Sequence, residues 1–167
     1  MSKVRELHVF CDASKRAFGA VAYLVYEQKV SFVMSKTRIA PIKDTKKNVQ
    51  DLTNPETELM SAYIGSTIAE TIIKATEAMK INLEVFMWGD NQVVLFWISK
   101  SEGHLRLFIK NRAKKIQDFN KARNAVWGYV STQHNPADIL PPKECKMCVN
   151  VQCDHTSTGI NINWMGV

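Results

Sequence analysis

Apolar and polar positions divide the chain into short strand-like runs, which come first, and longer segments with a helical period. Residues 6 to 35 hold three apolar runs of strand length, and a short polar turn around Gln28 joins the last two. Sequential strands at this spacing predict an antiparallel meander. The three runs are Leu7 to Asp12, Gly19 to Tyr26 and Val30 to Met34.

From Glu56 onward, apolar residues recur with the period of a helix. They form one wide face as far as about Met79, which predicts a long helix with Glu58 in its first turn. The segment from Lys36 to Glu56 is polar and rich in lysine, so we interpret it as a surface loop.

Strands and helices alternate in the remaining part of the chain up to Asp138. We expect, in order, a strand at Val85 to Trp88, a short apolar helix at Gln92 to Ser99, a basic amphipathic helix at His104 to Lys121, a last strand at Val126 to Val130 and the start of a helix at Asn135-Pro136. This order predicts an α/β fold with a five-stranded mixed sheet and helices on its faces. The first and fourth strands are expected to be adjacent and parallel at its centre.

Composition places the chain among ordinary globular domains. It has 167 residues, of which 46% are hydrophobic and 23% charged, enough for one domain with a sizeable core. Lysine and arginine number 22 against 16 acidic residues, a net charge of +6. A basic body suits binding to a polyanion, although a merely soluble basic protein is the alternative. No apolar stretch has bilayer length and the N-terminus has no apolar signal core, so we expect an intracellular, soluble protein in the cytoplasm or nucleus.

Four acidic residues stand out because of where they fall in this pattern. Asp12 and Asp90 each end an apolar run, and a buried strand that stops at an acid leaves the carboxylate at the edge of the sheet. Neighbouring carboxylates repel unless a cation lies between them, which favours a hard ion such as Mg²⁺ or Mn²⁺. Unrelated surface acids are the alternative for any one residue, but the joint placement of Asp12, Glu58, Asp90 and Asp138 favours one site.

The four cysteines are not expected to form disulfides inside a cell. Cys11 lies in the first apolar run and is interpreted as a small core residue. The other three fall near the C-terminus in a C-x2-C and C-x-H arrangement that could bind a structural Zn²⁺, with free thiols as the alternative. The candidate zinc ligands are Cys145, Cys148, Cys153 and His155.

Taken in order, the local motifs resemble the ribonuclease H family, and most closely the ribonuclease H segment of BEL/Pao-type LTR retrotransposon polyproteins. Each motif is weak alone, and their joint order over about residues 6 to 140 is specific. Trp164-Met165-Gly166 is similar to a further downstream element. The matching motifs are Leu7 to Ser14 with Phe18 to Tyr23, Ser35 to Pro41, Glu58-Leu59-Met60, Trp88 to Gln92 with Phe96-Trp97-Ile98, Phe108 to Arg112 and Asn135 to Leu140.

This resemblance implies hydrolysis of the RNA strand of RNA–DNA hybrids by a two-metal mechanism during reverse transcription, with Mg²⁺ or Mn²⁺ as the two ions. It implies that Asp12 bridges both ions, that Asp138 holds the ion on the nucleophile side, and that Glu58 and Asp90 hold the other. His134 is a candidate for proton transfer, with a plain surface histidine as the alternative. The implied domains are a catalytic domain at 1–140 and a C-terminal extension at 141–167, and the implied partner is a reverse transcriptase domain in the same polyprotein.

Recognition of a hybrid needs contacts to 2′-hydroxyl groups on one strand and phosphates on the other. Polar residues beside the acids and basic residues of the predicted amphipathic helix could supply them. The candidates are Ser14, Lys15, Arg16, Asn91, Gln92, Arg106, Lys110 and Arg112.

Two departures from the family pattern leave alternatives open. The loop before Pro55 is longer than usual, which makes Glu56 a competitor of Glu58, and a shift of two helical residues turns a side chain by about 200°. After Asp138, Pro141-Pro142-Lys143 replaces the usual residues. A catalytically weak module that binds RNA or hybrids is the main alternative function. An integrase or transposase core fits less well, and an aspartic peptidase is disfavoured because the chain has no Asp-Thr-Gly or Asp-Ser-Gly.

Overall fold

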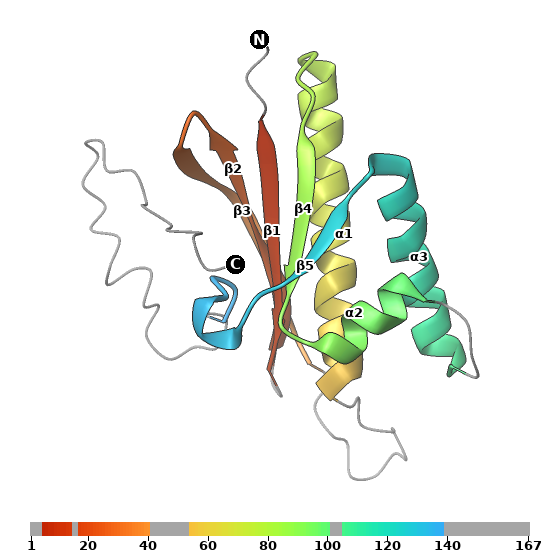
Figure 1. The fold of residues 1–167 in the computed structure, drawn as a ribbon. Coiled ribbons are helices and arrows are strands. Elements are labelled where there is room, and N and C mark those ends of the chain that lie inside the picture. Colours follow the sequence, from red (N-terminus) through yellow and green to blue (C-terminus); the bar gives the residue numbers. More distant parts are fainter. Residues whose placement is uncertain (1–4, 15–16, 41–53, 101–104, 139–167) are drawn as a thin grey trace.

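Strand β1 lies at the centre of a five-stranded sheet with the order β3-β2-β1-β4-β5 (Figure 1). The computed structural model describes residues 5–14, 17–40, 54–100 and 105–138. β1 pairs antiparallel with β2 and parallel with β4, which confirms the predicted meander and the central parallel pair. The strands are β1 (Glu6–Ala13), β2 (Ala17–Tyr26), β3 (Lys29–Ile39), β4 (Glu84–Gly89) and β5 (Val126–Tyr129). The helices are α1 (Asn54–Ala78), α2 (Gln92–Ser99), α3 (Leu107–Arg123) and the short 3₁₀ helix η1 (Thr132–His134).

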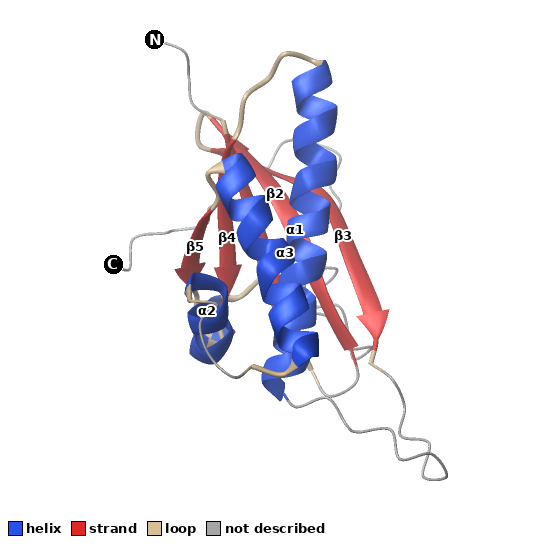
Figure 2. Ribbon diagram, turned by 90° about the vertical axis from the view of Figure 1, so that its right-hand side faces the viewer, coloured by secondary structure: helices blue, strands red, loops and turns tan. Residues whose placement is uncertain are grey.

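Helix α1 covers one face of the sheet (Figure 2). Side chains alternate between the two faces of a strand, and those of Leu7, Val9 and Cys11 on β1 form the main core with apolar residues of α1. Gly65 allows close contact between the two layers, because a Cβ atom there would lie 2.5 Å from Sγ of Cys11. Burial of Cys11 confirms that it is a core residue.

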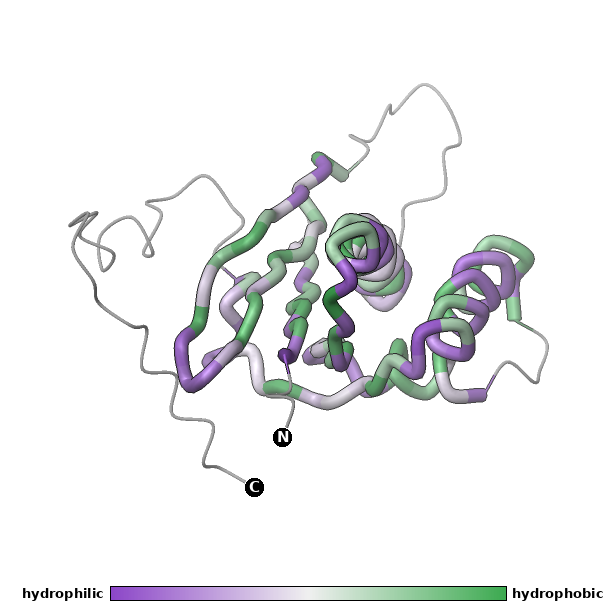
Figure 3. The backbone as a smooth tube through the Cα atoms, turned by 90° about the horizontal axis from the view of Figure 1, so that it is seen from above, coloured by the Kyte–Doolittle hydropathy of each residue, from purple (hydrophilic) through white to green (hydrophobic). Residues whose placement is uncertain are grey.

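Helix α3 lies next to α1 on the same side of the sheet (Figures 2 and 3). The two helices and α2 share a second apolar cluster that includes Leu59, Val94 and Ile116. Arg123 near the end of α3 forms ion pairs with Glu70 and Glu77 of α1, at 2.8 and 2.6 Å. These contacts hold the helical layer together.

The opposite face of the sheet carries a smaller aromatic cluster. Phe10 and the buried residues Val130 and Ala137 belong to this cluster. Trp88 packs against it and stacks on Phe10 with ring centroids 6.1 Å apart. Val130 and Ala137 flank η1, so the chain that follows β5 is held close to the end of β1.

The structure corrects the bounds of three elements. Residues 36 to 39 belong to β3 rather than to a loop, because an exposed edge strand tolerates polar side chains while its backbone pairs with β2. Helix α1 already begins at Asn54, and α3 runs from Leu107 to Arg123 rather than from His104 to Lys121. Where a helix start was expected at Asn135, the described residues form a turn.

Several expectations lie outside the described residues. They concern Lys15, Arg16 and everything after Asp138, including the candidate zinc ligands. In the described part of the chain, no helix combines the length and apolar character needed to cross a bilayer.

Candidate metal and nucleic-acid site

Parallel pairing of β1 and β4 brings two of the acids together. The pairing register ends at Phe10 opposite Trp88, so Asp12 and Asp90 each lie two residues beyond the same rung. Both strands point the same way, and their carboxyl ends meet at one edge of the sheet. Asp12 is 6% exposed, which is low for a carboxylate.

Glu58 approaches these two acids from the first part of α1. Ligand oxygens of Asp12, Glu58 and Asp90 all lie within 4.8 Å of one another. Oδ1 of Asp90 is buried and has no hydrogen-bond partner among the described residues. A buried carboxylate oxygen without a donor is costly unless a cation is bound, and three hard oxygen donors at this spacing fit a divalent ion such as Mg²⁺.

The pKa values of Asp12 and Glu58 also favour a bound cation. Burial raises the pKa of Asp12 to about 6, and the charges of Asp90 and Asp138 add to the rise. Burial also raises the pKa of Glu58 to about 9, with further contributions from Asp90 and Asp12. The backbone N–H of Ala13 opposes both shifts by hydrogen bonding. Without a cation, the cluster therefore resists full ionisation at neutral pH.

Asp138 lies beside this trio rather than within it. It is exposed in the turn after η1, yet its charge raises the pKa of Asp12, so the two carboxylates interact. Asn135 holds this turn in place, because its Nδ2 donates to the backbone carbonyl of Cys11 at 2.9 Å and its Oδ1 accepts from the N–H of Ala137 at 3.0 Å. The sequence marked Asn135 as a helix start and as part of a motif, and gave no sign of its link to β1.

The structure separates Glu58 from its competitor Glu56. The turn of about 200° between them predicts that only one faces inward, yet Glu56 is buried and Glu58 is half-buried. Its carboxylate pairs with the Arg106 guanidinium at 3.5 Å, whereas that of Glu58 joins Asp12 and Asp90.

His134 lies in η1, outside the carboxylate trio. Its Nδ1 is 2.7 Å from the hydroxyl of Ser131, and the side chain is exposed. The sequence did not single out a third residue of this turn, Thr132, whose hydroxyl donates to Oδ2 of Asp90 at 2.9 Å.

The candidate nucleic-acid contacts fall into two groups. Beside the acids, Asn91 caps α2 by accepting from two backbone N–H groups, and Gln92 is exposed. The Ser14 hydroxyl donates to the backbone carbonyl of Ala17 and accepts from its N–H. The basic residues Arg106, Lys110 and Arg112 belong to the first half of α3 or directly precede it, and Arg112 lies over the ring of Phe108.

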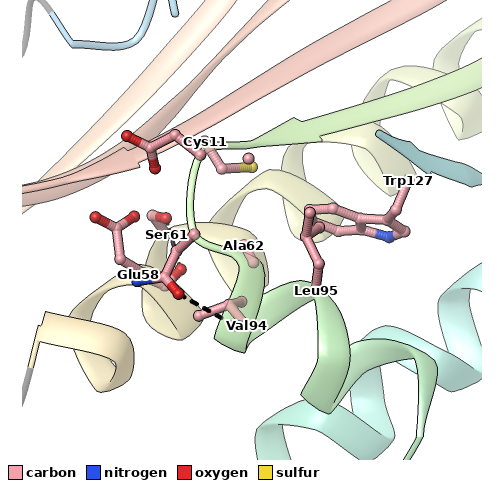
Figure 4. Close-up of a pocket in the computed structure, with 10 residues that line it drawn as sticks. Cys11, Glu58, Ser61, Ala62, Val94, Leu95 and Trp127 are labelled. Carbon is pink, nitrogen blue, oxygen red and sulfur yellow. Dashed lines mark hydrogen bonds between the residues drawn. The ribbon is translucent and has the colours of Figure 1, made fainter. Parts of the chain in front are cut away.

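A shallow pocket is lined in part by two of the three acids, Glu58 and Asp90 (Figure 4). Figure 4 shows Cys11, Glu58 and Ser61 on one side of it and Leu95 and Trp127 on the other. The Ser61 hydroxyl donates to the backbone carbonyl of Glu58 at 2.7 Å, so it bonds within α1 rather than to the pocket.

A mixed sheet of this order, with three acids at the ends of β1 and β4 and at the start of α1, is the arrangement of a ribonuclease H-like domain. Solved structures agree on the fold. The N-terminal RNase H domain of a Mycobacterium tuberculosis protein, solved as a fusion with maltose-binding protein, superimposes with a TM-score of 0.58 at 12% identity, covering 87% of this chain and 96% of that one. LC11-RNase H1, solved in complex with an RNA/DNA hybrid, gives 0.52 at 12% identity, covering 87% and 99%.

The family itself is identified from the sequence. A family described as Pao retrotransposon-like RNaseH-like domain matches residues 1–91, more than half of the chain. The chain belongs to this family. No curated protein matches it.

Proposed function

We propose that this domain is a divalent-metal-dependent endoribonuclease that hydrolyses the RNA strand of RNA–DNA hybrids during reverse transcription of a retroelement. One observation carries the proposal. Three elements far apart in the sequence bring Asp12, Glu58 and Asp90 within 4.8 Å, and one oxygen of Asp90 is buried without a donor among the described residues. Packing alone does not explain such a costly arrangement, whereas a bound cation would.

The acids would divide two Mg²⁺ or Mn²⁺ ions between them. Asp12 would bridge both, Glu58 and Asp90 would hold one, and Asp138 would complete the other. When bound, such ions lower the pKa of a coordinated water and stabilise the departing oxygen of a phosphodiester. His134 would exchange protons at the exposed edge of the site, oriented by Ser131.

The proposed substrate also fits the charge of the molecule. LC11-RNase H1, which shares the fold, was solved with an RNA/DNA hybrid. The net charge of +6 favours binding to a polyanion, and the basic residues at the start of α3 would bind phosphates. These residues are Arg106, Lys110 and Arg112. A second group follows the acids in the sequence and would contact the strand that is cut, namely Ser14, Lys15, Arg16, Asn91 and Gln92. We extend the proposal to a catalytic domain at 1–140 with an extension at 141–167, and to a reverse transcriptase domain as partner.

Cleavage of an end-labelled RNA–DNA hybrid with Mg²⁺ or Mn²⁺ tests the proposal. The wild-type chain is compared with Asp90→Asn and with Glu84→Gln, a control that removes an exposed acid from the opposite end of the same strand. We expect metal-dependent loss of the RNA strand that Asp90→Asn reduces by about a hundredfold or more and Glu84→Gln leaves unchanged. Double-stranded DNA should stay intact.

Tight, metal-independent binding of the hybrid without cleavage would instead support the alternative of a binding module. Equal cleavage by wild type and Asp90→Asn would show that the activity does not come from this site.

A further inference from the structure

The two carboxylate oxygens of Asp90 lie in different surroundings. Oδ2 accepts a hydrogen bond from the hydroxyl of Thr132 at 2.9 Å. Oδ1 is buried without a partner among the described residues, and Asp90 offers a ligand oxygen to the cluster with Asp12 and Glu58. The Thr132 hydroxyl thus distinguishes the two oxygens of one side chain.

Thr132 can do so because the chain on both sides of it is fixed. Before it, the N–H of Val130 donates to the carbonyl of Gly89 at 3.0 Å, which holds the end of β5 against the residue that precedes Asp90. After it, Asn135 is 4% exposed and donates from its side chain to the carbonyl of Cys11. These bonds tie η1 to the ends of β4 and β1, the two strands that carry the acids.

We propose that Thr132 is a positioning residue for the metal site: its hydroxyl fixes the rotation of the Asp90 carboxylate and keeps Oδ1 available for the cation. This inference rests on the metal-dependent function proposed above. The χ2 angle of an aspartate has a broad distribution, so a carboxylate without a hydrogen bond samples many orientations. That freedom must be lost when an ion binds. Residues that orient metal ligands typically account for 10- to 100-fold in metal affinity, and an exposed hydroxyl should fall at the low end.

Metal titration tests the role without relying on catalysis. Mn²⁺ binding to the full chain is measured by calorimetry for wild type, Thr132→Val and Thr132→Ser. Valine keeps the shape and removes the donor, whereas serine keeps the donor. We expect Thr132→Val to weaken binding by about tenfold, and Thr132→Ser to stay within about threefold of wild type.

Thr71→Val is the matched control. Thr71 is exposed on α1 and its hydroxyl also donates over 2.9 Å, but to the carbonyl of Thr67. This variant should bind Mn²⁺ like wild type. Because both threonines are exposed, the midpoint of thermal unfolding in EDTA should be nearly the same for all of these variants.

A double-mutant cycle shows whether Thr132 acts through Asp90. In an Asp90→Asn background, Thr132→Val should cause no further loss of Mn²⁺ affinity. A full additional loss would overturn the inference, and so would equal affinity of wild type and Thr132→Val. If wild type itself binds no Mn²⁺, the metal site fails and the role of Thr132 fails with it. If wild type binds and only the valine effect is missing, the metal site stands and the positioning role does not.

Discussion

Replacing Gly65 with alanine tests the close contact that positions α1 on the sheet. An added Cβ would lie 2.5 Å from Sγ of Cys11, 3.2 Å from Cε of Met87 and 3.3 Å from Cγ1 of Val9. The end of the Met87 side chain can shift, but Cys11 is buried on the central strand and has one short side-chain torsion. Overpacking of this kind costs about 1–3 kcal/mol, and the higher helix propensity of alanine returns about 1 kcal/mol.

We therefore expect Gly65→Ala to lower the free energy of unfolding by up to about 2 kcal/mol, which lowers the midpoint by up to about 8 °C for a chain of this size. Urea denaturation measures it in wild type and in Cys11→Ala. With Sγ absent, the same glycine change should cost little or even stabilise the protein. Gly89→Ala is the control, because a methyl group there meets only Trp127 at 4.0 Å. An equal loss in both backgrounds would refute the reasoning.

Two further predictions concern the cluster and its support. Since the pKa values of Asp12 and Glu58 are raised on folding, their protonation stabilises the metal-free protein below about pH 4, and this stability is lost as pH rises through about 6 and about 9. The slope reaches at most about 1.4 kcal/mol per pH unit for each group, less where solvent screens the charge. The midpoint of thermal unfolding in EDTA should therefore fall from pH 5 to pH 9, and less steeply in Glu58→Gln. In a separate series without EDTA, Mg²⁺ should raise the midpoint more at pH 8 than at pH 5. The opposite order would contradict the link between ionisation of the cluster and metal binding. Asn135→Ala should cost about 1–3 kcal/mol, because it leaves a buried carbonyl of β1 without its donor, and urea denaturation that matches wild type would argue against the link.

The sequence predicted the parts of the site that depend on local pattern. Asp12 and Asp90 were found because each ends a buried apolar run, and α2 was predicted with its observed bounds, from Gln92 to Ser99. In the same way, the helical period from Glu56 onward placed Glu58 near the start of α1.

What the sequence could not supply depends on contacts between distant parts of the chain. The bond from Thr132 to Asp90 spans 42 residues and needs the turn of η1, for which no periodic pattern exists. The ion pair between buried Glu56 and Arg106, which directly precedes α3, joins two parts of the chain that no local pattern relates. The extension of β3 to Ile39 follows from backbone pairing with β2, to which polar side chains give no clue.

The pairing of β1 with β4 also bears on when the site can exist during synthesis. A chain emerging from the ribosome presents Asp12 first, but the neighbouring strand follows only after the meander and the whole of α1 have been made. The support from Thr132 and Asn135 comes later still. A chain that ends before β4 therefore lacks the metal site altogether, because Asp12 gains its neighbour Asp90 only when the first and fourth strands have paired.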